Sequence, residues 1–248
     1  MNIRLKGAHL SLKMKNDNLE KNMTQLEERT DKASNIQDIY RVHYFNAEQT
    51  AVFEAPEDHS YYFKTFIGHH NVEVERGDCV YLLSADKKTA FLKRGRCQVE
   101  SFHCATIVRG FMPADRSCSL EGLPVLPYVN GCSTKQIFAP PRPGDPTLQY
   151  LHIPAHSAEQ AHHIHSTVRV VYTLSGNGTS VVGMEGLTAK EELTPGKVCI
   201  LEPMCPHHFE TPYGQSLIVV PLHIFSATSG VETAHPMFNG TYLMNQGS

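Results

Sequence analysis

The chain of 248 residues is 41% hydrophobic and 19% charged, with a formal net charge of −3 and a sequence pI near 6.6. This balance excludes a wholly disordered chain and supplies enough apolar material for one large or two ordinary domains. It gives no electrostatic reason to expect nucleic acid or an anionic membrane as a partner, and no apolar run approaches the roughly 18 residues of a membrane span.

The N-terminus and the cysteines predict a cytoplasmic protein. Charged and polar residues interrupt every apolar pair from Met1 to Asp38, so we expect no secretory signal. Seven cysteines, an odd number without a C-x-x-C pair, favour reduced thiols over a disulfide framework. The first 16 residues are basic and free of acids, which keeps a transit peptide as the alternative.

Residues 1–39 form a leader without aromatic residues. Leu19, Met23 and Leu26 recur at a helical spacing, which predicts a short amphipathic helix, with plain disorder as the alternative. From Tyr40 onward, short runs rich in β-branched and aromatic residues end at Gly, Pro, Asn or Asp. Such runs are typical of the strands of a barrel or sandwich, so we expect an all-β fold. The expected strands cover 40–45, 50–53, 61–67, 72–84, 89–92 and 105–111.

A Pro- and Gly-rich stretch at 123–147 predicts a connection between two barrels. A second set of strands is expected at 148–225. The tail at 226–248 is too hydrophobic to hang free; it either caps a barrel mouth or pairs with another subunit, and the sequence leaves both open.

Histidine is the unusual residue. Nine of the 15 histidines lie between His152 and His235. In an extended chain His163 and His165 point to the same side, so their imidazoles can converge on one ion. A predicted strand at 168–174 follows and ends in a hairpin-type turn at 176–178. A turn at Pro195-Gly196 leads to a second strand and then to His207-His208, and a third imidazole from there would complete a set suited to iron, manganese, cobalt, nickel, copper or zinc.

These two segments resemble the paired motifs of the cupin superfamily. The first family motif, G-x5-H-x-H-x3,4-E-x6-G, is matched in spacing by His163, His165, Arg169 and Gly176. The second, G-x5-P-x-G-x2-H-x3-N, is matched by Gly196, Pro203, Cys205 and His208 with one insertion. The resemblance implies a double-stranded β-helix, or jelly roll, over 148–225, with a metal held by His163, His165 and His208.

The sequence departs from the family pattern at several positions. Arg169 replaces the glutamate that is usually a fourth ligand, Ser157 and Cys205 replace glycines, and Pro212 stands where the asparagine would fall. Cupin dioxygenases that act on thiols are similar in lacking the acidic ligand. Residues 40–122 resemble a second, degenerate cupin without metal, because Thr89 stands twelve residues after Gly77, where a histidine would be needed.

Several assignments leave alternatives. His162 and His207 are the alternative ligands, and the choice between His207 and His208 is the weakest, since a loop can break strand parity. Cys199 and Cys205 are further, weaker candidates as ligands. Parity directs Arg169 into the barrel, where its charge requires a carboxylate: Glu202, Glu210 or an anionic substrate. Tyr172 and His223 either line the pocket or pack in the core.

The sequence therefore predicts a two-barrel, metal-dependent cupin. A non-haem Fe(II) dioxygenase acting on a small anionic substrate is the first hypothesis, with Mn, Ni, Cu or Zn as alternative metals. Its candidate catalytic residues are Arg169, Tyr172 and Glu210. The alternatives are a non-oxidative metal-dependent isomerase, lyase or hydrolase, and a non-catalytic module that binds a small molecule. We also expect a homodimer, because barrels of this type often pair through edge strands.

Overall fold

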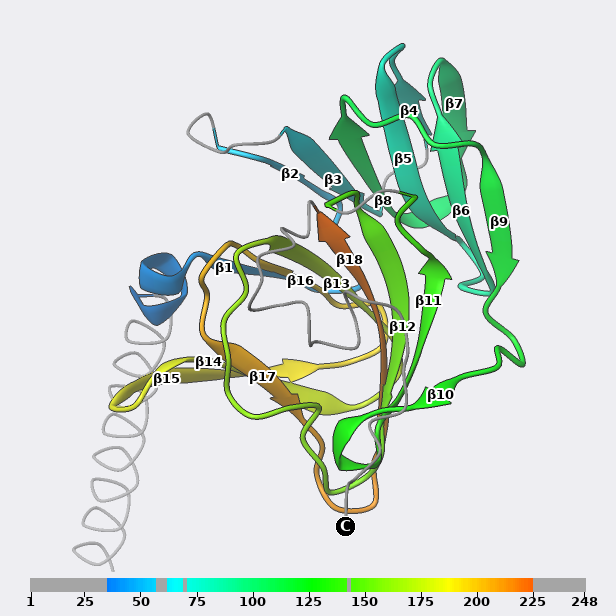
Figure 1. Cartoon of the computed structure of the whole chain (residues 1–248). Helices are drawn as coiled ribbons and strands as arrows, with labels where there is room; N and C mark the ends of the chain where they lie inside the picture. The colour runs from blue at the N-terminus through cyan, green and yellow to red at the C-terminus, as the bar shows by residue number, and fades with distance from the viewer. Residues whose placement is uncertain (1–34, 57–61, 69–70, 142–143, 225–248) are drawn as a thin grey trace, which may run out of the picture.

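The computed structural model describes residues 35–56, 62–68, 71–141 and 144–224. Within these ranges the fold is nearly all β: strands β1 to β18 are joined by loops, residues 35–40 are helical, and one 3₁₀ turn, η1, covers Val129–Gly131. The strands form two barrels, each made of a large and a small antiparallel sheet (Figure 1). The expected all-β class with two cupin-type barrels is confirmed.

The first barrel joins a six-stranded and a two-stranded sheet. The larger sheet has the order β2 (Ala51–Glu54), β3 (Phe63–Ile67), β8 (Phe102–Arg109), β5 (Asp78–Ser84), β6 (Thr89–Arg94) and β9 (Arg116–Ser119). The smaller sheet pairs β4 (Asn71–Val74) with β7 (Cys97–Glu100). Aliphatic and aromatic side chains fill the space between the sheets, among them Val74, Leu82, Phe102 and Ile107.

The second barrel joins a seven-stranded and a three-stranded sheet. The larger sheet has the order β1 (Val42–Phe45), β16 (Val198–Leu201), β13 (Val168–Gly176), β18 (Leu217–Ile224), β12 (Thr147–Ile153), β11 (Ser133–Phe138) and β10 (Leu126–Pro127). The smaller sheet has the order β15 (Leu187–Leu193), β14 (Gly178–Met184) and β17 (His207–Glu210). Between the sheets lie apolar residues such as Val171, Leu201 and Phe209, beside a polar cavity described below.

Two parts of the chain join the second barrel although the sequence placed them elsewhere. Strand β1, expected in the first barrel, pairs with β16 through contacts such as Tyr44 with Cys199. Strands β10 and β11, expected in the connection at 123–147, extend the same sheet from β12. Local residue patterns identify a strand but not the strand with which it pairs, so the sequence could not show that these strands belong to the second barrel.

The segment 176–178 is a corner and not the hairpin turn that the sequence suggested. Strands β13 and β14 lie in different sheets, so the chain crosses from one sheet to the other at this point. Gly176 has a φ of 77°, and a Cβ there would lie 1.9 Å from the carbonyl oxygen of Ser216. A glycine is required because both the backbone conformation and the close approach exclude a side chain.

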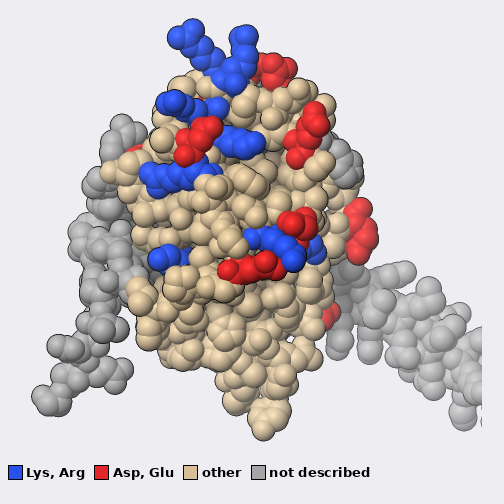
Figure 2. All heavy atoms as spheres, turned by 90° about the vertical axis from the view of Figure 1, so that its right-hand side faces the viewer, with Lys and Arg blue, Asp and Glu red and all other residues tan. Residues whose placement is uncertain are grey.

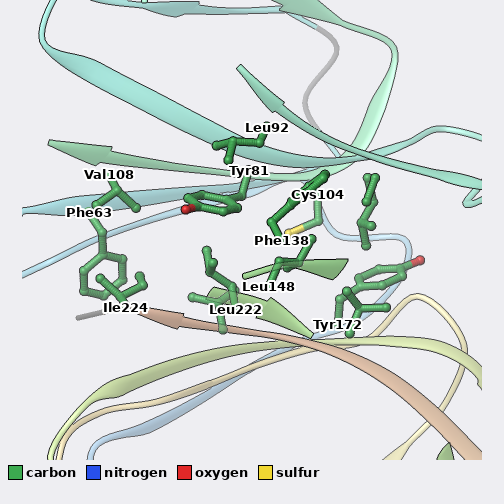
Figure 3. Packing of buried hydrophobic residues seen from close by; sticks show 14 of the residues in the cluster. Phe63, Tyr81, Leu92, Cys104, Val108, Phe138, Leu148, Tyr172, Leu222 and Ile224 are labelled. Atoms are coloured by element: carbon green, nitrogen blue, oxygen red, sulfur yellow. The ribbon is translucent and has the colours of Figure 1, made fainter. Parts of the chain in front are cut away.

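The two large sheets pack face to face around a shared apolar core. Phe63, Tyr81 and Val108 of the first barrel meet Leu148, Tyr172 and Leu222 of the second in this layer (Figure 3). Tyr172 is 2% exposed, and its ring centroid lies 5.0 Å from that of His103 in the first barrel. The barrels therefore share one buried interface, and Tyr172 belongs to it.

The surface view in Figure 2 shows Lys and Arg side by side with Asp and Glu in its upper half and few charges in its lower half. Among the described residues, no helix is long and apolar enough to cross a membrane. The predicted leader helix around Leu19 to Leu26 and the tail at 226–248 lie outside the described residues, so these expectations stay predictions.

Candidate metal centre

A short segment before β13 runs antiparallel to β17 and positions the site. The Thr211 amide donates to the Ser157 carbonyl at 2.8 Å, and the Glu159 amide donates to the Phe209 carbonyl at 3.0 Å. Further along, His163 and His207 exchange two backbone hydrogen bonds of 2.9 and 3.1 Å. This pairing fixes which residues of the segment stand opposite which residues of β17.

Three imidazoles converge where the segment ends. One nitrogen from each of His163, His165 and His207 lies within 4.8 Å of the others. The Nε2 atoms of His163 and His165 are 2.8 Å apart, and the ring centroids of His163 and His207 are 4.6 Å apart. No other group of three such side chains gathers within the described ranges of the chain. The predicted convergence of His163 and His165 thus matches the geometry, although their segment is not a regular strand.

The hydrogen bonds behind these rings suit a transition metal. The Nδ1 atoms of His163 and His207 lie 2.7 and 2.8 Å from the carbonyl oxygens of Ala161 and Cys205. Because a carbonyl can only accept, both Nδ1 atoms carry the proton, and the Nε2 lone pair of the neutral ring faces the cluster. Histidine ligands of metals are commonly held in this way by a hydrogen bond from the second ring nitrogen. The residues therefore fit a divalent metal.

Burial keeps the three rings neutral. Removal from water lowers the pKa of His163 and His165, and it lowers the pKa of His207 to about 3. The charge of Arg169 lowers all three further, since a nearby cation disfavours a second positive charge. Neutral imidazoles at neutral pH are the form that binds metal, so the cluster needs little proton release to bind a metal ion.

The structure brings His207, and not His208, to the other two histidines. Side chains of β17 alternate, so His207 and Phe209 point inward while His208 and Glu210 point outward. The Nδ1 atom of His208 lies 2.7 Å from that of His162, and the Nε2–H of His162 donates to the Gly183 carbonyl at 2.7 Å. His162 and His208 thus form a separate pair outside the barrel, and the assignment of His208 as a ligand gives way to His207.

The second motif fits His207 when it is aligned without an insertion. In that frame Glu202 takes the position of the motif's proline, Met204 takes that of its glycine, and His207 follows at the required distance. Met204 has a φ of 65°, the left-handed conformation for which glycine is preferred. Pro203 matches the proline of the motif in identity but not in its distance from Gly196, and the spacing is what places His207 at the metal-ligand position.

Arg169 lies in the same cavity as the histidines. The space at this site is about 390 Å³ when the part open to solvent is counted, and its wall includes Arg169 and His223 beside the three rings. Arg169 and His223 are each 3% exposed and stand opposite one another on β13 and β18. The inward direction predicted for Arg169 is therefore observed. Of the two alternatives for His223, lining the pocket or packing in the core, the structure shows the first.

Both internal carboxylates considered for Arg169 are engaged elsewhere. Glu202 lies 2.8 Å from the guanidinium of Arg41 and 2.8 Å from the ring of His43. Glu210, on the outward face of β17, accepts a hydrogen bond of 2.7 Å from Lys190. Glu210 and Tyr172, both candidate catalytic residues, are absent from the cavity wall: Glu210 faces out, and Tyr172 faces the first barrel from the opposite side of β13.

Glu159 is a cavity residue that the sequence motifs did not indicate. It is 6% exposed and lines the cavity with Arg169. Burial raises the pKa of its carboxyl to about 8, against the opposing charge of Arg169. The available signal was parity, because Glu159 precedes His163 by four residues and so shares its face of an extended chain.

The cysteines near the second motif are not part of the cluster. Cys199 and Cys205 are buried, and burial raises the pKa of Cys205 to about 12 and that of Cys199 well above its usual value. Thiols held protonated in this way are poor ligands. Cys205 contributes through its backbone, since its carbonyl orients the ring of His207.

Comparisons with known proteins agree with this fold. No protein-family model and no curated protein sequence matches the chain. Among solved structures, the protein Ylba from E. coli is similar with a TM-score of 0.52 at 12% identity, covering 73% of this chain and 90% of that one. HEPD from Streptomyces albus, solved with 2-hydroxyethylphosphonate and Fe(II) bound, gives a TM-score of 0.50 at 8% identity, covering 79% of each chain. The chain has the fold of the cupin superfamily, in its two-barrel form.

Proposed function

We propose that the chain is a metal-dependent cupin enzyme in which His163, His165 and His207 hold one divalent transition metal. The observation that carries this proposal is the convergence of three neutral imidazoles in a buried cavity that also contains Arg169. Three nitrogen ligands leave coordination positions open, as in catalytic metal sites. Fe(II) is the first candidate metal, supported by the ligand set and by the Fe(II) seen in HEPD; Mn, Ni, Cu and Zn are the alternatives.

The proposed substrate is a small anion. The guanidinium of Arg169 keeps its charge at all working pH values, and five N–H donors suit it to a carboxylate or phosphonate group. Because Arg169 is buried in the same cavity as the histidines, an anion bound to it would lie near the proposed metal ligands. The cavity walls, including Val171, Leu201 and Phe209, restrict water and orient the substrate.

Oxidation by dioxygen is the first reaction class that we propose. A ferrous ion, when bound, would supply the redox chemistry, and the protein would supply the neutral ligand set, the anion site and the exclusion of water. The chain would then be a non-haem dioxygenase.

A metal-dependent reaction without oxygen is the second candidate, and Glu159 favours it. Among the described residues of the cavity wall, Glu159 is the only carboxyl group, and lyases, isomerases and hydrolases need a group that moves protons. In this reaction class the metal would polarise the substrate as a Lewis acid.

The decisive experiment is elemental analysis of protein purified without a metal-affinity column, followed by assays with thiols, phenols and diketones in an oxygen electrode. We expect about one equivalent of metal per chain in the wild type and none in His207→Ala. Oxygen consumption supports the dioxygenase; turnover under argon with zinc or nickel supports the second class. Retention of an unaltered ligand in air would favour a binding module, and absence of metal would refute the proposal.

A further inference from the structure

We propose that Glu159 determines substrate specificity, by selecting substrates that carry a hydrogen-bond donor, such as an amino or hydroxyl group, in addition to the anionic group held by Arg169. This inference rests on the proposed metal-dependent function and narrows its substrate class. A site with Arg169 alone would accept any small anion. Above its raised pKa of about 8, Glu159 is ionised, and its carboxylate then repels a second negative charge and accepts a hydrogen bond from a donor.

The position of Glu159 is set by backbone pairing. Its amide donates to the Phe209 carbonyl, and four residues later His163 pairs with His207. Phe209 and His207 are the two inward residues of β17. The pairing that brings the metal ligands together therefore also turns Glu159 into the cavity, where it is 6% exposed.

Glu159 is not one of the ligands. The group of converging ligand atoms contains the three imidazole nitrogens and no carboxylate oxygen from the described residues. Glu202 and Glu210 are engaged by cations outside the cavity, so the described wall has one carboxyl group and one guanidinium. Burial raises the pKa of Glu159, and the charge of Arg169 opposes this rise, so the two groups are close enough to interact.

A guanidinium and a carboxylate in one small cavity suit a ligand that carries both an anionic group and a hydrogen-bond donor. An anionic group binds Arg169, and an N–H or O–H group donates to the Glu159 carboxylate. A site that hydrogen-bonds a substrate group rejects an analogue lacking it, because a buried polar partner is then left without its bond. A second carboxylate on the ligand would instead be repelled by the negative charge of Glu159.

The test uses four probes that differ by one group: acetate, glycolate, glycine and oxalate. Their affinities are measured by calorimetry at about pH 9, above the pKa of Glu159, on the zinc-loaded protein, which cannot oxidise them. The variants are Glu159→Gln and, as matched control, Glu210→Gln, the same change on the outward face of β17. Glycolate, glycine and oxalate also chelate zinc. For each probe, the ratio of its affinity to that of acetate is therefore determined, and this ratio is compared between the wild type and the variant.

We expect the preference for glycine and glycolate over acetate to fall about tenfold in Glu159→Gln, while oxalate binds the variant more tightly than the wild type. Glu210→Gln should keep the wild-type preferences. Equal preferences in wild type and Glu159→Gln overturn the inference. Glu159→Asp, which retains the charge, should retain part of the preference if the glutamine variant folds poorly. Loss of zinc from the wild type, or no binding of acetate to it, would instead refute the proposed function.

Discussion

The two barrels share a fold and an interface but differ in what fills them. Among the described residues, an apolar cluster that includes Val74, Leu82 and Phe102 lies between the sheets of the first barrel. The corresponding space of the second contains His163, His165, His207, Arg169 and Glu159. The sheets pair the backbone N–H and C=O groups in both barrels, so the same architecture can form around apolar or polar side chains.

The polar interior of the second barrel is costly for stability, which is what is expected of a site that binds a ligand. Buried imidazoles, a guanidinium and a carboxyl destabilise a fold unless they are paired or bind a ligand, whereas aliphatic residues stabilise it directly. The first barrel thus provides an internal reference: a similar architecture with an apolar cluster between its sheets, next to one that contains the histidine cluster.

Replacing a ligand should have the largest effect. We expect His207→Ala to weaken zinc binding by more than about 100-fold, because one of three ligands is lost and even residues behind the ligands contribute 10- to 100-fold. His208→Ala should bind zinc as the wild type does, since its ring lies outside the barrel. Competition with a chromophoric chelator measures both. The reverse ranking would restore His208 as the ligand.

Truncating a core phenylalanine in each barrel should lower stability in both cases but weaken metal binding in only one. Phe102→Ala in the first barrel and Phe209→Ala in the second each remove a nearly buried ring and should cost about 3–5 kcal/mol in free energy of unfolding. Only Phe209→Ala should also weaken zinc binding, because Phe209 neighbours His207 on β17, with ring centroids 6.1 Å apart. Denaturant unfolding and zinc titration check the pair; equal metal affinities would contradict the comparison.

Acid should destabilise the metal-free protein through the second barrel. The folded-state pKa of His207 is about 3, below the unfolded value near 6.5, so the unfolded chain binds more protons in between. Stability should therefore be full above about pH 6.5 and fall as the pH drops toward about 3. His207→Phe should reduce this dependence. Thermal unfolding over this pH range measures it, and an unchanged slope in the variant would refute the assignment.

Removing the hydroxyl of Tyr172 should have the smallest effect. No described residue hydrogen-bonds that buried hydroxyl, so Tyr172→Phe should leave stability unchanged or slightly higher, and metal binding intact. Tyr44 is the matched control, because its hydroxyl donates to Ser180 at 3.0 Å. Tyr44→Phe should cost about 1 kcal/mol. A loss of turnover in Tyr172→Phe would show that Tyr172 has a catalytic role after all.

The class of fold and the convergence of two histidines could be predicted from the amino-acid sequence alone. Short β-branched runs closed by turn residues predicted the strands, because strand formation depends on local side-chain pattern. The spacing of His163 and His165 predicted their convergence, and strand parity predicted that Arg169 points inward. These features are local, and periodicity within a strand is enough to decide them.

Which strands pair, and which side chains meet, could be seen only in the three-dimensional arrangement. There β1, β10 and β11 belong to the large sheet of the second barrel, Tyr172 faces the first barrel, and His207 rather than His208 joins the histidine cluster. Each outcome depends on which strand pairs with which and in what register, and a shift of one residue reverses every side chain. Glu159 entered the cavity for the same reason, because its direction is set by pairing with β17, a strand nearly fifty residues away.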